Sequence, residues 1–195
     1  MSGLAARLRP AEASDFAAIH AIYRHHVLNG LGSFEEHPPE LAEMQRRHGD
    51  VVAHGLPYLV AAGQSVGAAG GSSAGSAGGG KLLGYAYAAP FRARSAYRFT
   101  VEDSVYIAPD AVGHGVGRAL LTEVIERCTA LGKRQMIAVI GDSGNAGSIA
   151  LHRALGFSPP MTLHGAGFKF GRWVDIVLMQ RALGPGNDIP PPPGA

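Results

Sequence analysis

The spacing of apolar side chains along the chain predicts strands and helices in alternation. Apolar residues recur every three or four positions over 16–27 and over 120–131, which is the spacing of one helix face. Two further helices are expected, one after Pro39 and one ending at Leu155. Shorter apolar runs predict strands over 4–9, 57–62, 81–90, 99–109 and 135–141, followed by two late strands around MTLHGAG and RWVDIVLMQ.

This order of elements predicts an α/β fold. The middle of the chain reads strand, helix, strand, helix, and the run over 135–141 is so uniformly apolar that it is typical of a buried parallel strand. We therefore expect a mixed sheet with antiparallel hairpins at its ends. With 195 residues the chain is long enough to bury one core, so one domain is expected over 1–183.

Two segments lack the apolar residues that a core needs. The tract GQSVGAAGGSSAGSAGGG, over 63–80, is expected to be a long, flexible hairpin loop. The tail over 184–195 is rich in Pro and is expected to be disordered.

Composition and charge exclude several classes of protein. The 17 basic and 15 acidic residues give a net charge of +2, so nothing favours a nucleic-acid partner. A single cysteine, Cys128, excludes an internal disulfide framework and favours a reducing cytoplasm. We find no signal-peptide pattern and no apolar run of about 18 residues, so we expect a cytoplasmic protein with no membrane partner.

The stretch AVGHGVGRALL, over 111–121, places glycines at alternate positions before a helical pattern. The unpaired N–H groups of a helix N-terminus attract anions, and glycines let a phosphate approach them closely. The alternative is a glycine-rich turn without a ligand. Two familiar phosphate motifs are excluded, because Arg118 and Leu120 stand where GxGxxG needs small residues and the chain contains neither GKS nor GKT.

The same loop resembles the xxGxGxA/G loop with which GNAT N-acetyltransferases bind pyrophosphate. VEDSVYIAPDAVGHGVGRALL, QMIAVIGDSGNAGSIALHRALGF and GFKFGRWVDIVLMQ are similar to the branch that acetylates phosphinothricin and methionine sulfoximine. GSFEEHPP, at 32–39, and PFRARSAYRFT, at 90–100, are similar to that branch too. The resemblance implies a GNAT fold, in which helices flank a mixed, mostly antiparallel twisted sheet that splays between its fourth and fifth strands.

The resemblance also implies which residues bind acetyl-CoA, the co-substrate. They are Val105, Tyr106, Ile107, Gly113, His114, Gly115, Val116, Gly117, Arg118, Asn145 and Ser148. One position departs from the family. Three residues before Gly115 the family usually carries Gln or Arg, and this chain carries Val112.

An amine attacks a thioester only when it is neutral, so this reaction needs a base and a proton for the departing thiolate. The resemblance assigns the base to Glu102, for which the alternative is an exposed strand carboxylate. Asn145, Ser148 and His152 share one face of the last helix, which Asn145 or Ser143 caps. The branch carries His where most GNAT enzymes carry a Tyr proton donor. Whether His152 is base, acid or structural residue stays open.

The resemblance places four residues around an acidic amino-acid substrate, namely Phe34, Arg94, Tyr97 and Ser104. A guanidinium suits a carboxylate, phosphinate or sulfonyl group, whereas Arg92 and Arg98 are interpreted as solvated loop residues. For Phe34 the alternative is packing in the core. The nine histidines lack the spacing of a metal site, so no metal is expected.

The leading hypothesis is an acetyl-CoA-dependent N-acetyltransferase for a small amino-acid analogue, with a homodimer implied by family likeness. One alternative is a GNAT enzyme for another amine, such as a protein N-terminus or a polyamine. Another is a module that binds acetyl-CoA without catalysis, against which the presence of both Glu102 and His152 counts.

Overall fold

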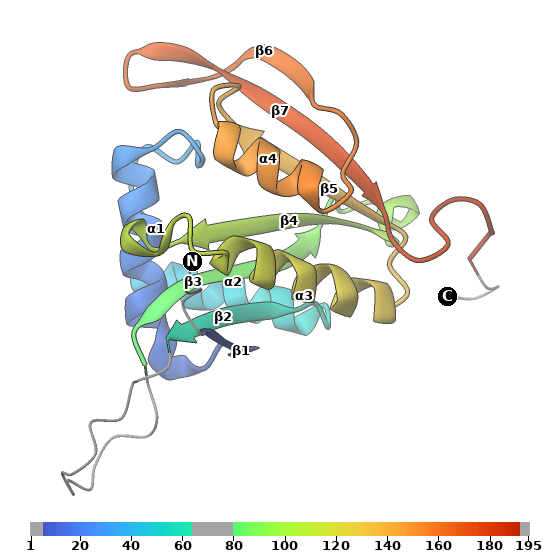
Figure 1. Cartoon of the computed structure of the whole chain (residues 1–195), viewed down its shortest axis with the longest axis horizontal. Helices are drawn as coiled ribbons and strands as arrows, with labels where there is room; N and C mark the ends of the chain where they lie inside the picture. Colours follow the sequence, from blue (N-terminus) through green and yellow to red (C-terminus); the bar gives the residue numbers. More distant parts are fainter. Residues whose placement is uncertain (1–5, 64–79, 192–195) are drawn as a thin grey trace, which may run out of the picture.

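A computed structural model describes residues 6–63 and 80–191, whose seven strands form a single sheet (Figure 1). The strands are β1 (Ala6–Pro10), β2 (Tyr58–Gly63), β3 (Leu82–Pro90), β4 (Thr100–Ile107), β5 (Gln135–Gly141), β6 (Met161–Lys169) and β7 (Arg172–Ala182). Their order across the sheet is β1-β2-β3-β4-β5-β7-β6. All neighbouring strands are antiparallel except β4 and β5, which are parallel. The predicted α/β class and mixed sheet are confirmed.

Helices cover both faces of this sheet. The α-helices of the described residues are α1 (Phe16–Asn29), α2 (Leu41–Ala53), α3 (Val116–Ala130) and α4 (Ala146–Ala154). Short 3-10 turns are η1 (Ala13–Asp15), η2 (Ser95–Tyr97) and η3 (Pro109–Ala111). In Figure 1, α1 and α2 lie behind β2, β3 and β4, whereas α3 crosses in front of them and α4 lies beside β5.

The apolar faces predicted from spacing are the buried faces of the helices. Along α3 the buried side chains include Leu120, Leu121, Val124 and Cys128, and their partners are the central strands. Leu131, the last residue of the predicted apolar pattern, caps the helix and is 51% exposed. The periodicity therefore located the helix and its buried face, and erred by one residue at its end.

The sheet opens between β4 and β5. The two strands pair from Thr100 opposite Gln135 to Asp103 opposite Ala138, and no further. Beyond that point Ser104–Ile107 keep their pairing with β3, and 138–141 keep theirs with β7. The splay between the fourth and fifth strands is thus confirmed, and it begins directly after Asp103.

Two predicted segments lie partly outside the described residues. The loop predicted over 63–80 is described only at Gly63 and Gly80, and the strands that flank it pair as the predicted hairpin, with Gly63 N–H donating to Lys81 O at 2.8 Å. In the tail, two turns close through Gly186 N–H to Leu183 O and Asp188 N–H to Pro185 O, while 192–195 lie outside the described residues.

Candidate active site

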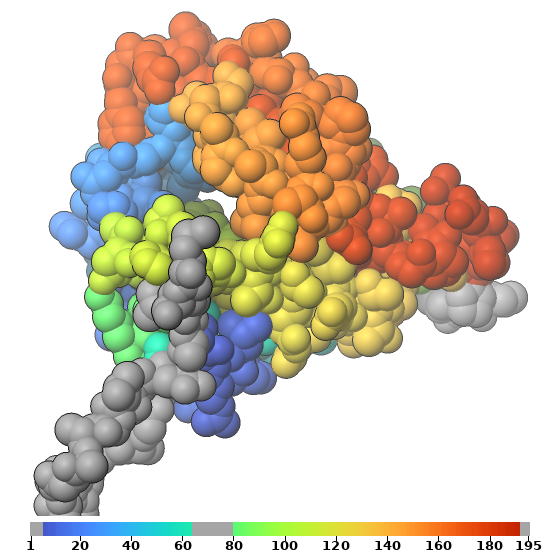
Figure 2. Space-filling model, viewed as in Figure 1, coloured from blue at the N-terminus to red at the C-terminus, as the bar shows by residue number. Residues whose placement is uncertain are grey.

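A cleft of about 610 Å³ lies where β4 and β5 part. One wall consists of the end of β4, the glycine loop and the start of α3, and the other consists of β5 and α4. The space-filling view shows the molecule hollowed between the yellow-green residues around the glycine loop and the orange residues of α4 (Figure 2). The open part of the sheet is therefore accessible from the side of α3 and α4.

The glycine loop adopts a backbone that requires glycine at two positions. Gly113 and Gly115 both have φ of +82°, in the left-handed region that side chains disfavour. Gly115 is the N-cap of α3, so the N–H groups of the first helical turn have no carbonyl partner within the helix. At Gly117 an added Cβ would lie 3.4 Å from the Leu151 side chain, which is ordinary van der Waals contact, so packing does not require glycine at this third position. The loop presents free N–H donors to the cleft.

The other predicted loop residues are at the surface of the same site. Val112, which replaces the family's usual polar residue, is 61% exposed and lines the cleft. His114 bonds back to the loop through Nδ1, 3.0 Å from Val112 O. Arg118 is exposed and also lines the cleft, so its charge is available there.

On the opposite wall, Asn145 caps α4 as predicted. Its side-chain oxygen accepts the N–H of Ser148 at 3.2 Å, which orients the first turn of the helix. Both residues line the cleft. The hydroxyl of Ser148 also lies 3.4 Å from Nδ1 of His152.

His152 forms a buried pair with Asp103, a residue that the sequence analysis missed. Nε2 of His152 lies 3.0 Å from Oδ2 of Asp103, and Nδ1 lies 2.8 Å from Ser148 O. Burial lowers the pKa of His152, but the hydrogen bond and the charge of Asp103 outweigh it, so this pKa lies above its ordinary value. The signal for Asp103 was its position, because it lies between Val101 and Val105 on the same, inward face of β4.

Glu102 points to the other face of the sheet. Successive side chains of a strand alternate between faces, so Glu102 faces α1 and α2 while Asp103 faces α4. Burial raises the pKa of Glu102 above its ordinary value, the charge of Arg92 opposes this, and the charge of Asp103 adds to it. Arg92, interpreted as a solvated loop residue, is exposed, and its charge acts on Glu102.

Aromatic rings lie on the same face of the sheet as Glu102. Tyr106 packs edge-on against Tyr23 of α1 at 5.0 Å and stacks on Tyr85 at 5.2 Å. His26 of α1 lines the cleft and donates from Nε2 to Ile107 O at 2.8 Å. Burial lowers the pKa of His26, so the ring is a neutral donor that joins α1 to the end of β4.

The predicted substrate residues Phe34, Arg94, Tyr97 and Ser104 lie in different parts of the structure. Ser104 is two residues beyond Glu102 along β4, on the same face, and lines the cleft. The Phe34 ring packs on Gly141 and Gly167, so closely that a Cβ at Gly167 would lie 2.1 Å from the ring. Arg94 and Tyr97 lie in the β3–β4 connection, where Tyr97 packs edge-on against Phe91. Neither of them lines the cleft.

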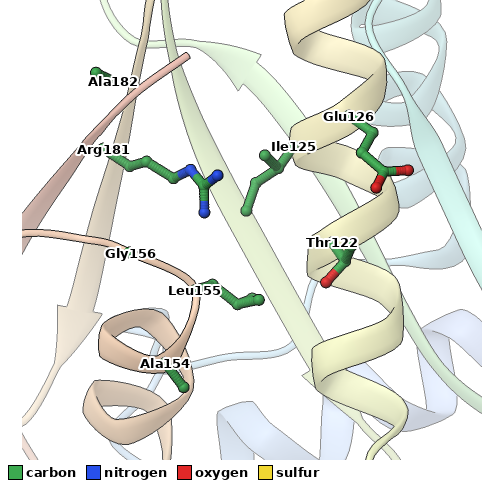
Figure 3. A pocket seen from close by; sticks show the side chains of 8 residues that line it. All are labelled: Thr122, Ile125, Glu126, Ala154, Leu155, Gly156, Arg181 and Ala182. Atoms are coloured by element: carbon green, nitrogen blue, oxygen red, sulfur yellow. The ribbon is translucent and has the colours of Figure 1, made fainter. Parts of the chain in front are cut away.

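A second hollow, of about 520 Å³, lies between α3, the end of α4 and β7 (Figure 3). Arg181 points into it from β7 toward Ile125 of α3. The hollow meets the cleft at Ala154, which lines both. It contains neither the glycine loop nor His152, both of which line the cleft, so the cleft is the candidate active site.

Residues 6–63 and 80–191 hold neither a candidate metal cluster nor a candidate membrane span. These residues contain no group of three or more His, Cys, Asp or Glu side chains that could hold a metal ion. No helix in the same ranges is long and apolar enough to cross a membrane.

A helix N-terminus with free N–H groups beside a sheet that parts between two parallel strands defines the class of the N-acetyltransferases. The model of the Acetyltransferase (GNAT) family matches residues 19–157, and the chain belongs to this family. The predicted family and enzyme class are confirmed.

Three individual proteins are similar to this chain over most of its length. The chain is 52% identical over 187 residues to a phosphinothricin N-acetyltransferase of Alcaligenes faecalis, covering 96% of this chain and 87% of that protein. It is 38% identical to an L-methionine sulfoximine/L-methionine sulfone acetyltransferase of Pseudomonas aeruginosa, covering 96% and 100%. The crystal structure of a phosphinothricin acetyltransferase of Sinorhizobium meliloti in complex with AcCoA is similar with a TM-score of 0.86 and 49% identity, covering 97% of this chain and 94% of that one.

Proposed function

We propose that the protein transfers the acetyl group of acetyl-CoA to the amino group of a small amino-acid analogue, such as phosphinothricin or methionine sulfoximine or sulfone. The observation that carries this proposal is the opening of the sheet after Asp103, with the glycine loop lining the cleft there and Glu102 next to Asp103 on β4. The names of the relatives support the substrate class.

The cleft fits a long co-substrate that carries a pyrophosphate. Left-handed Gly113 and Gly115 leave no Cβ between the phosphates and the N–H groups of α3, and the helix dipole adds to the attraction. Arg118 and His114 supply further donors at the rim. Asn145 and Ser148 on α4 are the polar groups for the pantetheine arm, and residues 105–107 of β4 offer it backbone groups that no longer pair with β5.

The acetyl transfer takes place where β4 and β5 begin to part, directly after Asp103. A backbone N–H of the stretch Ser104–Tyr106 is available to the acetyl oxygen, because the strand has lost its β5 partner there. Glu102 takes the proton of the attacking amine, directly or through water. Its raised pKa makes it a stronger base than an exposed carboxylate.

The acceptor approaches from the face of α1 and α2. Ser104 and Glu102 share that face, and Phe34 borders it at Gly141. Arg94 and Tyr97, on the β3–β4 connection, bind the acidic group of the substrate. Arg92 contributes positive charge near Glu102 and favours an anionic acceptor.

We also propose that two copies of the chain associate. Large apolar side chains are exposed along the β6–β7 hairpin, namely Met161, Leu163, Phe168, Phe170 and Trp173, and the rings of Phe168 and Trp173 pack edge-on. A patch of this kind on a small protein marks an interaction surface. Sedimentation equilibrium tests this: the dimer is expected for the parent and is lost or weakened when Trp173 and Phe168 are both replaced by Ser.

The substrate proposal is tested by CoA release with a panel of amines at equal concentration. Phosphinothricin, methionine sulfoximine and methionine sulfone are expected to be acetylated faster than a polyamine or a peptide N-terminus. A preference for the peptide or the polyamine would overturn the substrate class and keep the enzyme class. We place this reaction in the cytoplasm, where acetylation of phosphinothricin would give resistance to that herbicide.

A further inference from the structure

The sheet consists of two halves that meet between β4 and β5. The first half is β1 to β4 with α3, and the second half is β5, β7 and β6 with α4. The halves pair over four residues of each strand and part after Asp103, where His152 of α4 also joins them by its hydrogen bond to Asp103 at 3.0 Å. Beyond this point β4 and β5 end at Ile107 and Gly141 on either side of the cleft. A structural element that fixes the width of the cleft must therefore cross the gap at its open end.

Residues 26–34, which we call the brace, cross the gap there. They run from the last turn of α1 into the connection to α2. At the start of the brace, His26 donates from Nε2 to Ile107 O at 2.8 Å, which fixes it to the end of β4. Further along the brace, Gly32 lines the cleft. One end of the brace is thus attached to the first half of the sheet, which carries the glycine loop.

The other end of the brace lies directly on the second half of the sheet. A Cβ at Gly141, the last residue of β5, would lie 2.0 Å from Leu31 O. A Cβ at Gly167 of β6 would lie 2.1 Å from the Phe34 ring. Cβ atoms do not approach other atoms so closely, so both strands admit the brace only because they carry glycine at these positions.

Lys169 of β6 fastens this end of the brace. Its side chain is buried, with 2% of the residue exposed, and Nζ donates to Gly30 O at 2.9 Å and to Ser33 O at 2.7 Å. An ammonium group has three donors and no acceptor, so it bonds two carbonyls and leaves no acceptor of its own unpaired. Nζ also lies 4.9 Å from the centre of the Phe170 ring, within the range of a cation–π interaction. Lys169 thus holds both carbonyls to the second half of the sheet.

The charge of Lys169 is costly to bury, because an ammonium group loses its hydration when it leaves water. The carbonyls replace part of that hydration, and the charges of Glu35 and Glu36 favour the ammonium form. A methionine would fill a similar volume without this cost, but it could not bond the two carbonyls. The buried lysine therefore gives the brace a defined position.

We propose that Lys169 is a positioning residue of the acetyl transfer, which sets the separation of β4 and β5 through the brace. The proposal rests on the proposed function, in which CoA crosses the gap between these strands. The glycine loop lies on the first half of the sheet and can bind the pyrophosphate by itself. Asn145 and Ser148 lie on the second half and meet the pantetheine arm only at the right separation. Lys169 therefore acts on binding of the pantetheine arm and leaves binding of the pyrophosphate unchanged.

The first test measures the separation of the two halves in the free protein, without any ligand. Spin labels are attached at Glu126→Cys of α3 and Arg153→Cys of α4, both exposed positions, while Cys128 is buried. The parent is expected to give one narrow distribution of label distances. In Lys169→Met, which keeps the length of the side chain and removes the ammonium group, the distribution is expected to broaden. An unchanged distribution in this variant would overturn the proposal.

The matched control is Lys133→Met. Lys133 also bonds a carbonyl, since its Nζ donates to Arg98 O at 2.9 Å, but it lies outside the brace and the cleft. The label distances of this variant are expected to equal those of the parent. Broadening as large as in Lys169→Met would mean that the loss of any such bond loosens the protein, and would overturn the proposal.

The second test compares two ligands by calorimetry, namely CoA and the nucleotide half of CoA, which ends at the pyrophosphate. In Lys169→Met the dissociation constant for CoA is expected to rise about tenfold, as it would if the competent separation were populated about one tenth of the time. The affinity for the nucleotide half is expected to stay the same. An equal loss for both ligands would indicate general damage to the fold, and no loss for CoA would show that the separation does not depend on Lys169. Either result would overturn the proposal.

A second variant covers the case in which Lys169→Met does not fold. Gly167→Ala keeps the ammonium group and displaces the brace, because its methyl group would meet the Phe34 ring. It is expected to weaken CoA and to spare the nucleotide half, and equal effects on both ligands would contradict the proposal. If the parent binds neither ligand, the proposed function fails, and the label distances still decide whether Lys169 sets the separation of the two halves.

Discussion

Glu102 and Asp103 are neighbours on β4 and face opposite sides of the sheet, one toward α1 and α2 and the other toward His152 of α4. The sheet opens immediately after them. An amine and a thioester can therefore meet from opposite sides at a single point of the chain.

Replacing Glu102 by Gln keeps the size of the side chain and removes its basicity. If Glu102 is the base, the turnover number falls by about 10²–10⁴-fold at neutral pH and partly recovers at higher pH, where more of the amine is neutral. Affinity for acetyl-CoA stays the same. The matched control is Glu126→Gln, at an exposed position of α3, which keeps parental turnover. Parental turnover in a stable Glu102→Gln protein would remove Glu102 from the mechanism.

Replacing Gly115 by Ala adds a Cβ at a backbone φ of +82°. The strain is about 1–2 kcal/mol and falls on the backbone of the loop, since nothing else lies within 4 Å of the new methyl group. Acetyl-CoA binding, measured by calorimetry, is expected to weaken at least tenfold in a protein that still folds. The control Gly49→Ala lies inside α2 with nothing near the new methyl group, and it is expected to gain roughly 0.5–1 kcal/mol of stability with unchanged binding. Unchanged affinity in Gly115→Ala would argue against a phosphate at this loop.

Replacing Val112 by Arg restores a donor where the family usually has one. Val112 is 61% exposed beside the cleft, so the new guanidinium can reach the pyrophosphate without disturbing the core. The dissociation constant for acetyl-CoA is expected to fall by about two- to fivefold, as for one surface ion pair. Val52→Arg adds the same charge at an exposed site of α2 and is expected to change nothing. Weaker binding in Val112→Arg would place the phosphates elsewhere.

The Asp103–His152 pair also predicts how stability depends on pH. The pKa of His152 is raised in the folded protein above the ordinary value of about 6.5, so the folded state holds this proton more tightly than the unfolded state. The stabilisation by the pair is complete below about pH 6.5 and is lost as the pH rises through the folded pKa.

Urea unfolding of the parent and of Asp103→Asn measures this effect. At about pH 6 the parent is expected to be more stable by about 1.5–3 kcal/mol, the contribution of a hydrogen bond to a charged group. The difference is expected to shrink toward about pH 9. A difference that is the same at both pH values would mean that His152 does not titrate in this range.

The sequence predicted most of the fold because its patterns are local. The apolar spacing located α1 and α3, the uniform run over 135–141 located the parallel strand, and Asn145 marked the start of α4. Asp103 was missed because its partner lies 49 residues away, in an element whose position depends on the whole sheet. The effect of Arg92 on the pKa of Glu102 was missed for a similar reason, because it depends on how the β3–β4 connection folds back.

The central claim is best tested by one assay of the purified full chain with acetyl-CoA and phosphinothricin, which follows thiol release and identifies the product by mass spectrometry. The account predicts release of one CoA thiol for each N-acetylated phosphinothricin, with little release when the amine is omitted. Thiol release that does not depend on the amine, or binding of acetyl-CoA with no acetylated product from any amino-acid analogue, would contradict it.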